Sequence, residues 1–336
     1  MRVGLLGYGL GGAVFHAPLI AATPGLDLAA VVTSDPGRQA EVRAAHPDAE
    51  VVASADELWT RDLDLAVVAT TNRTHVELAR AAVDAGVPVV VDKPLATSAA
   101  DGRALVAYAR ERGVPLTTYQ NRRWDGDFLT LRRLVADGEL GEVYRFESRF
   151  ERWRPTAKPG WREHGGPAEG GGILLDLGSH LIDQALLLFG PAASVYAEVD
   201  ARRPGVEVDD DVFLALTHAG GTRSHLWMSA VAGQLGPRFR VLGSRAAYVA
   251  PELDSQEAAL RSGGAPAPNA PGLLGAGDDV RTVETVPGAY LAFYAGVRDA
   301  LADGTPMPVD PADSVAVLEV VEAARRSARI GAPVST

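Results

Sequence analysis

The first 120 residues alternate between short β-branched runs and alanine-rich stretches in which apolar residues recur with helical spacing. The runs predict buried parallel strands at residues 3–6, 28–32, 65–69, 87–91 and 114–118. The stretches 75–85 and 98–112 predict helices, and Gly86 and Gly113 follow them where a left-handed cap favours glycine. Because strand–helix–strand repetition requires right-handed crossovers, this segment is predicted to fold as an α/β, doubly wound parallel sheet.

The hydrophobic pattern changes after about residue 120, where longer runs alternate polar with apolar residues. A strand is predicted at 143–150, in which residues 144–150 show the pattern, which is typical of a strand covered on one face only. Further strands are predicted at 193–199, 212–217, 222–229 and 238–242, and helices at 128–137, 176–188, 290–303 and 313–328. We therefore expect an α+β domain over residues 121–336, with a largely antiparallel open sheet. Within it, residues 261–279 are rich in Gly, Pro and Ala and are predicted to form a surface loop.

Length and charge limit the partners of the chain. Its 336 residues are many for one hydrophobic core, which favours two domains. Asp and Glu outnumber Lys and Arg by 43 to 32, so the formal net charge is −11. Phosphate backbones and anionic membrane surfaces repel such a chain, so neither nucleic acid nor a membrane is an expected partner. We expect a homodimer or homotetramer, because an exposed sheet face commonly pairs with a copy of itself.

The residue types that are missing exclude further classes. The chain has no cysteine, which excludes disulfides, a thiolate nucleophile and cysteine-ligated zinc. Its histidines show no H-E-x-x-H spacing, so no metal site is expected. The first residues enter an apolar strand without the cationic lead of a secretory leader, and no run approaches the roughly 20 apolar residues of a membrane span. The expected compartment is the cytoplasm.

A glycine-rich segment follows the first predicted strand. Gly7-Tyr8-Gly9-Leu10-Gly11-Gly12 satisfies G-x-G-x-x-G and opens a predicted helix, which is the context that distinguishes a dinucleotide-binding loop from a chance match. Gly7 permits the tight turn, Gly9 lets a pyrophosphate approach the backbone, and Gly12 allows helix and strand to pack closely. The alternative is an ordinary strand-to-helix turn. Residues 1–120 are thus predicted to form a Rossmann domain with Gly7, Gly9, Leu10 and Gly12 at the cofactor.

The tip of the second predicted strand bears on the choice of cofactor. An NAD-binding domain places a carboxylate there to bind the ribose 2′-hydroxyl. Here Thr33 and Ser34 occupy the tip and Arg38 follows, a set suited to the 2′-phosphate of NADP. Asp35 is open to two interpretations: it caps the next helix, with Pro36 at the first helical position, or it is the NAD carboxylate. NADP is the favoured cofactor, and NAD is the alternative.

Three later motifs connect the chain with a known family. The strand at 65–69 leads into Thr70-Thr71-Asn72-Arg73-Thr74-His75, the strand at 87–91 into Asp92-Lys93-Pro94, and residues 176–180 read Asp-Leu-Gly-Ser-His. These resemble the T-P-N-x-x-H, E-K-P and D-x-G-x-H motifs of Gfo/Idh/MocA oxidoreductases, in the same order along the chain. Residues 15–19 (Phe-His-Ala-Pro-Leu) and 121–130 look like the branch that contains NADP-dependent scyllo-inositol dehydrogenases. Two positions depart from the pattern: Thr71 replaces proline, and Asp92 replaces glutamate.

The resemblance implies a catalytic set that the chemistry of the residues also supports. Oxidising a secondary alcohol needs a base near neutral pH, and His180 is assigned that role. Lys93, at the carboxyl end of a parallel strand, is expected to hold the substrate oxygen and to contact the cofactor, while Asp176 binds a hydroxyl. The alternatives are a solvated lysine and a histidine that caps or lines the core. Thr71, Asn72 and His75 are expected beside the cofactor.

A polar rim around a polyhydroxylated ligand is predicted from aromatic and arginine residues in two short segments. Structural salt bridges are the alternative for each of them. The candidate substrate-binding residues are Asn121, Arg123, Trp124, Trp161 and Arg162, with Arg122 and Glu163 beside them.

Two classes of function remain open for such a chain, and within the enzyme class hydride transfer to an imine or a dihydrodiol is a further alternative. The first is an enzyme that transfers a hydride between NAD(P) and a secondary hydroxyl or ketone of a cyclic polyol or sugar. The second is a non-catalytic, cofactor-binding sensor on the same scaffold. Because both Lys93 and His180 are present, the sequence favours the enzyme.

Overall fold

In the computed structural model, which describes residues 1–157, 160–166 and 169–336, the strands form two separate sheets. The chain divides into two compact units, each built around one sheet. The first consists of Met1–Asn121, Glu257–Ala265 and Ala289–Val315, and the second of Arg122–Gln256, Pro266–Gly288 and Ala316–Thr336. The sequence prediction assigned everything after residue 120 to the second domain, whereas the structure places two later segments in the first unit.

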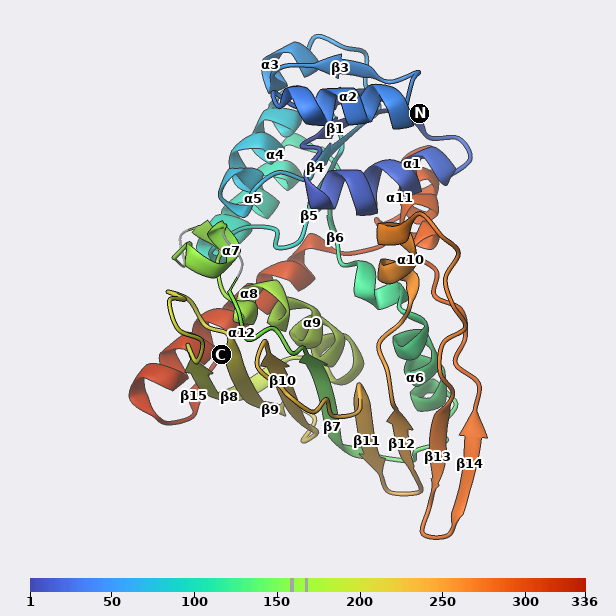
Figure 1. Cartoon of the computed structure of the whole chain (residues 1–336), viewed down its shortest axis with the longest axis vertical. Helices are drawn as coiled ribbons and strands as arrows, with labels where there is room; N and C mark the ends of the chain where they lie inside the picture. The colour runs from blue at the N-terminus through green and yellow to red at the C-terminus, as the bar shows by residue number, and fades with distance from the viewer. Residues whose placement is uncertain (158–159, 167–168) are drawn as a thin grey trace. The chain divides into compact units, whose positions relative to one another are not determined.

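The sheet of the first unit has the strand order β3-β2-β1-β4-β5-β6, and every neighbouring pair is parallel. The order reverses beside β1, and ligands of doubly wound sheets bind at the carboxyl ends of strands at such a reversal. Its strands are β1 (Arg2–Leu6), β2 (Asp27–Val32), β3 (Glu50–Val52), β4 (Leu65–Val68), β5 (Val89–Asp92) and β6 (Leu116–Tyr119). Its helices are η1 (Gly11–His16), α1 (Ala17–Ala22), α2 (Pro36–Ala45), α3 (Ala55–Leu58), η2 (Asn72–Thr74), α4 (His75–Asp84), α5 (Ala99–Arg112) and α11 (Leu291–Asp303), with most of α10 (Gln256–Ser262) (Figure 1).

The central strands of this sheet are apolar along their whole length because helices cover both faces. All four residues of β4 are fully buried, and the alanines Ala79 and Ala82 of α4 pack in the same core. Small side chains let a helix lie close to the sheet, while the β-branched strand residues fill the space between the layers. The α/β part of the predicted fold class is confirmed.

The second unit contains a sheet with the order β14-β13-β12-β11-β7-β10-β9-β8-β15. Neighbours are antiparallel except β7 and β10, which run parallel. The strands are β7 (Val143–Glu151), β8 (Ala192–Asp200), β9 (Asp211–His218), β10 (Arg223–Ser229), β11 (Phe239–Gly243), β12 (Ala247–Ala250), β13 (Gly272–Ala276), β14 (Asp279–Val283) and β15 (Val334–Ser335). The helices are η3 (Asn121–Trp124), α6 (Gly126–Ala136), α7 (Trp161–His164), α8 (Ile173–Asp176), α9 (Gly178–Phe189) and α12 (Pro311–Ile330), the first and last of which begin in the first unit.

One face of this sheet carries the core of the second unit. Phe146 of β7 packs against Phe189 at the end of α9, and Phe239 of β11 packs against Phe128 of α6. The opposite face is only partly covered and carries alternate residues such as Phe213 and Trp227, whose ring centroids lie 5.2 Å apart. The predicted largely antiparallel open sheet is therefore confirmed.

Three local predictions need correction. Residues 261–279 were expected to form a surface loop, but β13 and the start of β14 lie there. The single helix expected over 176–188 is two helices, because α8 ends at Asp176 and α9 begins at Gly178. The strands β3 and β12 were not predicted.

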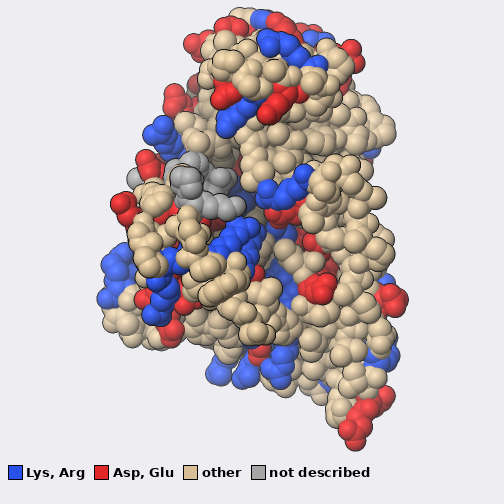
Figure 2. Space-filling view, in the orientation of Figure 1, with Lys and Arg blue, Asp and Glu red and all other residues tan. Residues whose placement is uncertain are grey.

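On the face shown in Figure 2, Lys and Arg are interspersed with Asp and Glu. Among the described residues, no helix combines the length and the apolar character that crossing a bilayer requires. In the same residues, no group of three or more His, Asp or Glu side chains is arranged to hold a metal ion.

Candidate functional site

The glycine loop after β1 presents backbone where a ligand phosphate could approach. Gly7 has φ +96°, and a Cβ on it would lie 2.7 Å from the Ala69 carbonyl oxygen. A Cβ on Gly12 would lie 2.0 Å from the Gly7 carbonyl oxygen, so only glycine fits where helix η1 meets the strand end. A Cβ on Gly9, by contrast, would meet one described atom within 4 Å, Nη1 of Arg38 at 4.0 Å. The loop therefore fits a dinucleotide pyrophosphate, with open space at Gly9 and a helix N-terminus behind it.

The tip of β2 presents a guanidinium beside this loop. Asp35 is the N-cap of α2, and its Oδ1 accepts a hydrogen bond of 3.0 Å from the backbone N–H of Arg38. Ser34 and Arg38 are exposed, whereas Thr33 is buried, and its hydroxyl oxygen lies 3.4 Å from the Asp35 backbone nitrogen as acceptor. Of the two interpretations of Asp35, the structure thus shows the helix cap. The Arg38 side chain, near Gly9, is placed to meet an anionic group on a ligand bound there.

The ends of β4 and β5 are joined by a buried histidine. His75 Nδ1 lies 2.8 Å from the Pro94 carbonyl oxygen, and Nε2 lies 3.3 Å from the Thr70 carbonyl oxygen. Burial lowers the pKa of His75, which favours the neutral ring. A neutral ring has one N–H and donates to only one of these two carbonyl oxygens, of which that of Pro94 is the nearer. His75 thus lies between two strand ends at the edge where ligands of such sheets bind. Beside it, Asn72 is buried and Thr71 is exposed.

Lys93 follows directly after β5, and its side chain is half-buried. Its backbone N–H donates to Asp92 Oδ1 at 2.8 Å. Burial pushes the pKa of Asp92 upward, but the contacts with the imidazoles of His16 and His75 and the charge of Lys93 outweigh it, so this pKa lies below its usual value. The carboxylate beside Lys93 is thus held in its charged form.

Asp176 and His180 belong to the second unit, and Lys93 belongs to the first. Asp176 ends α8 and is half-buried, whereas His180 lies in the first turn of α9 and is 5% exposed. Leu177 between the helices keeps helical backbone angles (φ −100°, ψ −38°), and its carbonyl oxygen accepts from the His180 N–H at 3.2 Å. The spacing of one turn between the two side chains is therefore retained across the helix junction.

A buried ion pair anchors the helix that carries His180. Arg123 donates from Nε and Nη2 to the two carboxylate oxygens of Asp183, at 2.8 and 2.6 Å. Both side chains are at most 7% exposed, and Asp183 lies one turn beyond His180. Arg123 thus ties the η3 turn to α9. The sequence reasoning missed Asp183, although the spacing His180-x-x-Asp183 placed an acid on the same helix face.

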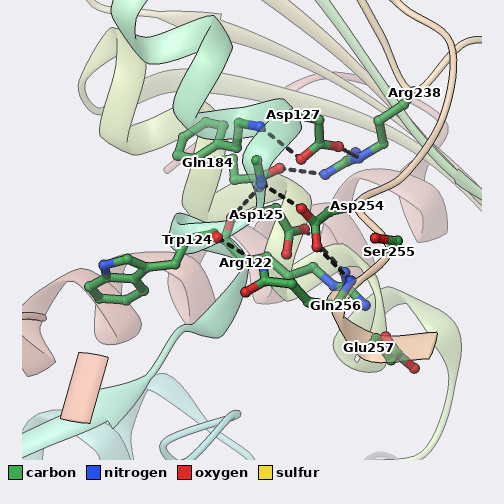
Figure 3. Close-up of polar contacts among 12 residues, drawn as sticks. Arg122, Trp124, Asp125, Asp127, Gln184, Arg238, Asp254, Ser255, Gln256 and Glu257 are labelled. Atoms are coloured by element: carbon green, nitrogen blue, oxygen red, sulfur yellow. Dashed lines mark hydrogen bonds and ion pairs between the residues drawn. The ribbon is translucent and has the colours of Figure 1, made fainter. Parts of the chain in front are cut away.

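Further buried polar contacts fix the same turn (Figure 3). Gln184 donates to the Arg122 carbonyl oxygen at 2.8 Å and accepts from Arg238 at 2.7 Å. Arg238 also lies 3.2 Å from Asp127, whose pKa is raised by burial, an effect that the charge of Arg238 only partly offsets. The start of α6 and the middle of α9 are therefore held in one network, which leaves little freedom for the backbone around Asn121 and Trp124.

The remaining candidates for the substrate rim lie in η3 and α7. Asn121 is buried and Trp124 is half-buried. Trp161 and Arg162 lie in α7, and their side chains fall outside what the structure describes. Glu163 pairs with the buried Arg203, which corresponds to the salt-bridge alternative for that residue.

Comparison with known proteins identifies the family from both halves of the chain. The model described as "Oxidoreductase family, NAD-binding Rossmann fold" matches residues 1–120, and the GFO/IDH/MocA C-terminal domain matches residues 128–249. The chain belongs to the Gfo/Idh/MocA oxidoreductase family. The resemblance inferred from the glycine loop and the three later motifs is confirmed. The unit that contains Gly7–Gly12 and Lys93 is thus the NAD-binding Rossmann unit of this family.

Relatives within the Gfo/Idh/MocA family span nearly the whole chain. The uncharacterized oxidoreductase YdgJ of Escherichia coli is 42% identical, and the alignment covers 98% of this chain and 96% of YdgJ. The scyllo-inositol 2-dehydrogenase (NADP(+)) IolW of Bacillus subtilis is 36% identical, with coverage of 98% and 94%. The solved structure of yvaA from B. subtilis is 35% identical, has a TM-score of 0.93, and covers 100% of this chain and 98% of its own.

Proposed function

We propose that this protein is an NADP-dependent dehydrogenase that interconverts a secondary hydroxyl and a ketone on a cyclic polyol or sugar of the inositol type. Family membership supports hydride transfer with a nicotinamide dinucleotide. The name of the relative IolW, a scyllo-inositol 2-dehydrogenase that uses NADP, supports the substrate class and the cofactor. The single observation in the chain itself that carries the proposal is the position of Arg38 beside the open backbone of Gly9.

The proposed preference for NADP rests on the residues that follow β2. Asp35 caps α2, because its Oδ1 accepts from the backbone N–H of Arg38. The exposed Ser34 and Arg38 offer a hydroxyl and a guanidinium in its place. A guanidinium forms charge-assisted hydrogen bonds with phosphate oxygens, which NAD lacks at this position.

The chemistry is assigned to three residues. When bound, the nicotinamide ring supplies the acceptor or donor for the hydride. We assign His180 to take the hydroxyl proton during oxidation and to return it during reduction, because an imidazole titrates near neutral pH. Lys93 holds the substrate oxygen and stabilises negative charge that develops on it. Asp176 accepts a hydrogen bond from a neighbouring hydroxyl.

The substrate rim is proposed to include Asn121, Trp124, Trp161 and Arg162. A half-buried aromatic face suits the apolar face of a sugar-like ring, while amide and guanidinium groups bind its hydroxyls. Arg123 contributes to this rim by fixing the turn that carries Asn121 and Trp124, through its bidentate pair with Asp183.

A two-way screen tests the proposal. Inositols, hexoses and sugar acids are each offered with NADP and with NAD, and reduced cofactor is followed by absorbance. The expected result is turnover with at least one cyclic polyol and a higher kcat/KM with NADP. Tight dinucleotide binding without turnover of any alcohol or ketone, in either direction, would instead indicate a cofactor-binding sensor. The Lys93→Ala variant controls for background oxidation in each reaction.

A further inference from the structure

His16 is a fully buried histidine at the end of helix η1, in the Rossmann unit. Its Nδ1 lies 2.6 Å from the hydroxyl oxygen of Tyr294, which α11 brings to the same unit. Its ring lies against Tyr119, with the ring centroids 4.5 Å apart. On its other side, Nε2 lies 3.6 Å from Asp92 Oδ1. His16 therefore stands between an aromatic core and the carboxylate that adjoins Lys93.

The contact with Tyr294, together with the carboxylate of Asp92 on the opposite side of the ring, favours one tautomer of His16. Burial raises the pKa of Tyr294 well above its usual value, so the side chain stays a phenol with one O–H to donate. Nδ1 of His16 lies at hydrogen-bond distance to accept it. A neutral imidazole that accepts at Nδ1 carries its hydrogen on Nε2. This tautomer points an N–H at the Asp92 carboxylate, whereas the other would set a lone pair against it.

Asp92 in turn connects His16 with the edge of the sheet formed by the carboxyl ends of the parallel strands. Its Oδ1 accepts from the Lys93 N–H at 2.8 Å, and its Oδ2 lies 2.8 Å from where a Cβ on Gly11 would be. The side chain is 23% exposed, while His16 is 0% exposed. Asp92 thus touches the backbone of Lys93, the first turn after the glycine loop, and the interior of the unit through His16.

We propose that His16 is a positioning residue for Lys93, and that Tyr294 sets the tautomer through which it acts. His16 directs Nε2 at the carboxylate of Asp92 from 3.6 Å, and Asp92 accepts from the backbone N–H of Lys93, from which the Lys93 side chain extends. His75 does the same on the other side of Lys93 through the Pro94 carbonyl oxygen. The inference rests on the proposed function, because it concerns how the Lys93 side chain is oriented toward a substrate oxygen. The shorter aspartate in place of glutamate makes the contact from His16 more important, because the carboxylate reaches less far on its own.

Two substitutions at His16 separate its two contacts. Glutamine places its amide near the position of Nε2 and keeps a donor toward Asp92, whereas asparagine places its amide near Nδ1 and keeps only the contact with Tyr294. We expect His16→Asn to lower kcat by about 10- to 100-fold, the usual effect of a small misplacement of a reacting group. His16→Gln should restore kcat close to wild type. NADP affinity should change far less than kcat in both, since the glycine loop itself is unaltered.

Equal losses in the asparagine and glutamine variants, or a loss shared by kcat and NADP affinity, would overturn the proposal in favour of simple core packing. Unchanged kcat in both would overturn it as well. Tyr294→Phe keeps the aromatic packing and removes only the hydroxyl, so it serves if the His16 variants do not fold. It should lower kcat without changing NADP affinity, and normal kcat in this variant would contradict the role of Tyr294.

A spectroscopic measurement decides the matter without a substrate. Nitrogen-15 NMR of the wild-type chain should show His16 as the Nε2–H tautomer, and Tyr294→Phe should change the mixture of tautomers. A His16 ring with its hydrogen on Nδ1 would refute the inference, whatever the enzyme turns over. If instead the wild type transfers no hydride with any polyol, the proposed function fails, and the tautomer still reports whether His16 is directed at Asp92.

Discussion

The side chain of Arg38 should discriminate between the two dinucleotides. Arg38→Ala removes the guanidinium near Gly9 but keeps the cap of α2, because Asp35 binds the backbone N–H of residue 38 rather than its side chain. Hydrogen bonds to charged groups contribute about 1.5–3 kcal/mol. Since Arg38 is exposed and solvent screens its charge, we take the lower end, about 1.5 kcal/mol, which corresponds to a roughly tenfold weaker Kd for NADP.

Calorimetric titration with NADP and NAD measures this effect directly. The variant should lose NADP affinity by about tenfold and keep its NAD affinity, and the NADP advantage of the wild type should shrink as salt is added. Arg43→Ala is the matched control, because Arg43 is an exposed arginine on the last turn of the same helix. Equal losses for both dinucleotides would refute the reasoning. A wild type that prefers NAD, together with loss of that preference in Asp35→Ala, would make Asp35 the ribose ligand.

Two further predictions follow from the geometry. Gly9→Val should abolish dinucleotide binding and leave the thermal midpoint nearly unchanged, because the site has space for a side chain in the free protein. Gly12→Ala should lower the thermal midpoint, because its Cβ would lie 2.0 Å from a carbonyl oxygen. Similar midpoints for the two variants would contradict this reasoning. Arg123→Ala should lower the free energy of unfolding by about 3–5 kcal/mol in urea titrations, since it leaves Asp183 buried without its partner. Arg132→Ala, at an exposed position on α6, is the control. An equal loss in the free energy of unfolding there would show that the buried pair adds no more stability than an exposed arginine does.

Local patterns were sufficient for the elements that are long or covered by uniform layers. The parallel strands of the first unit are apolar because both faces are buried, and the glycine loop is restricted by backbone contacts that any such turn must make. The strand β13 was missed because its pairing depends on a distant residue: Gly272 lies where a Cβ would come within 2.5 Å of the Tyr248 ring of β12. Glycine there indicates close packing, but in the sequence it looks like a loop.

The partners of the candidate site residues were harder to predict than the residues themselves. Lys93 and His180 could be predicted from motifs, whereas the contact of Tyr294 with His16 joins residues 278 positions apart. The apolar face of a predicted helix does not indicate which sheet the helix will cover. For the same reason the return of residues 289–315 to the first unit could not be foreseen. Arg123 shows the same limit, because an arginine next to a tryptophan suggests a ligand rim until a buried carboxylate is found beside it.

The central claim is that His180 carries the substrate proton in a dehydrogenase that acts on a cyclic polyol. Its most direct test compares the wild type with His180→Ala on the polyol found in the screen, at saturating NADP. The account predicts a kcat lower by about 10²–10⁴-fold, unchanged NADP affinity, and loss of the histidine limb of the pH profile. Near-normal turnover in His180→Ala would contradict this mechanism and leave Lys93 as the group that moves the proton.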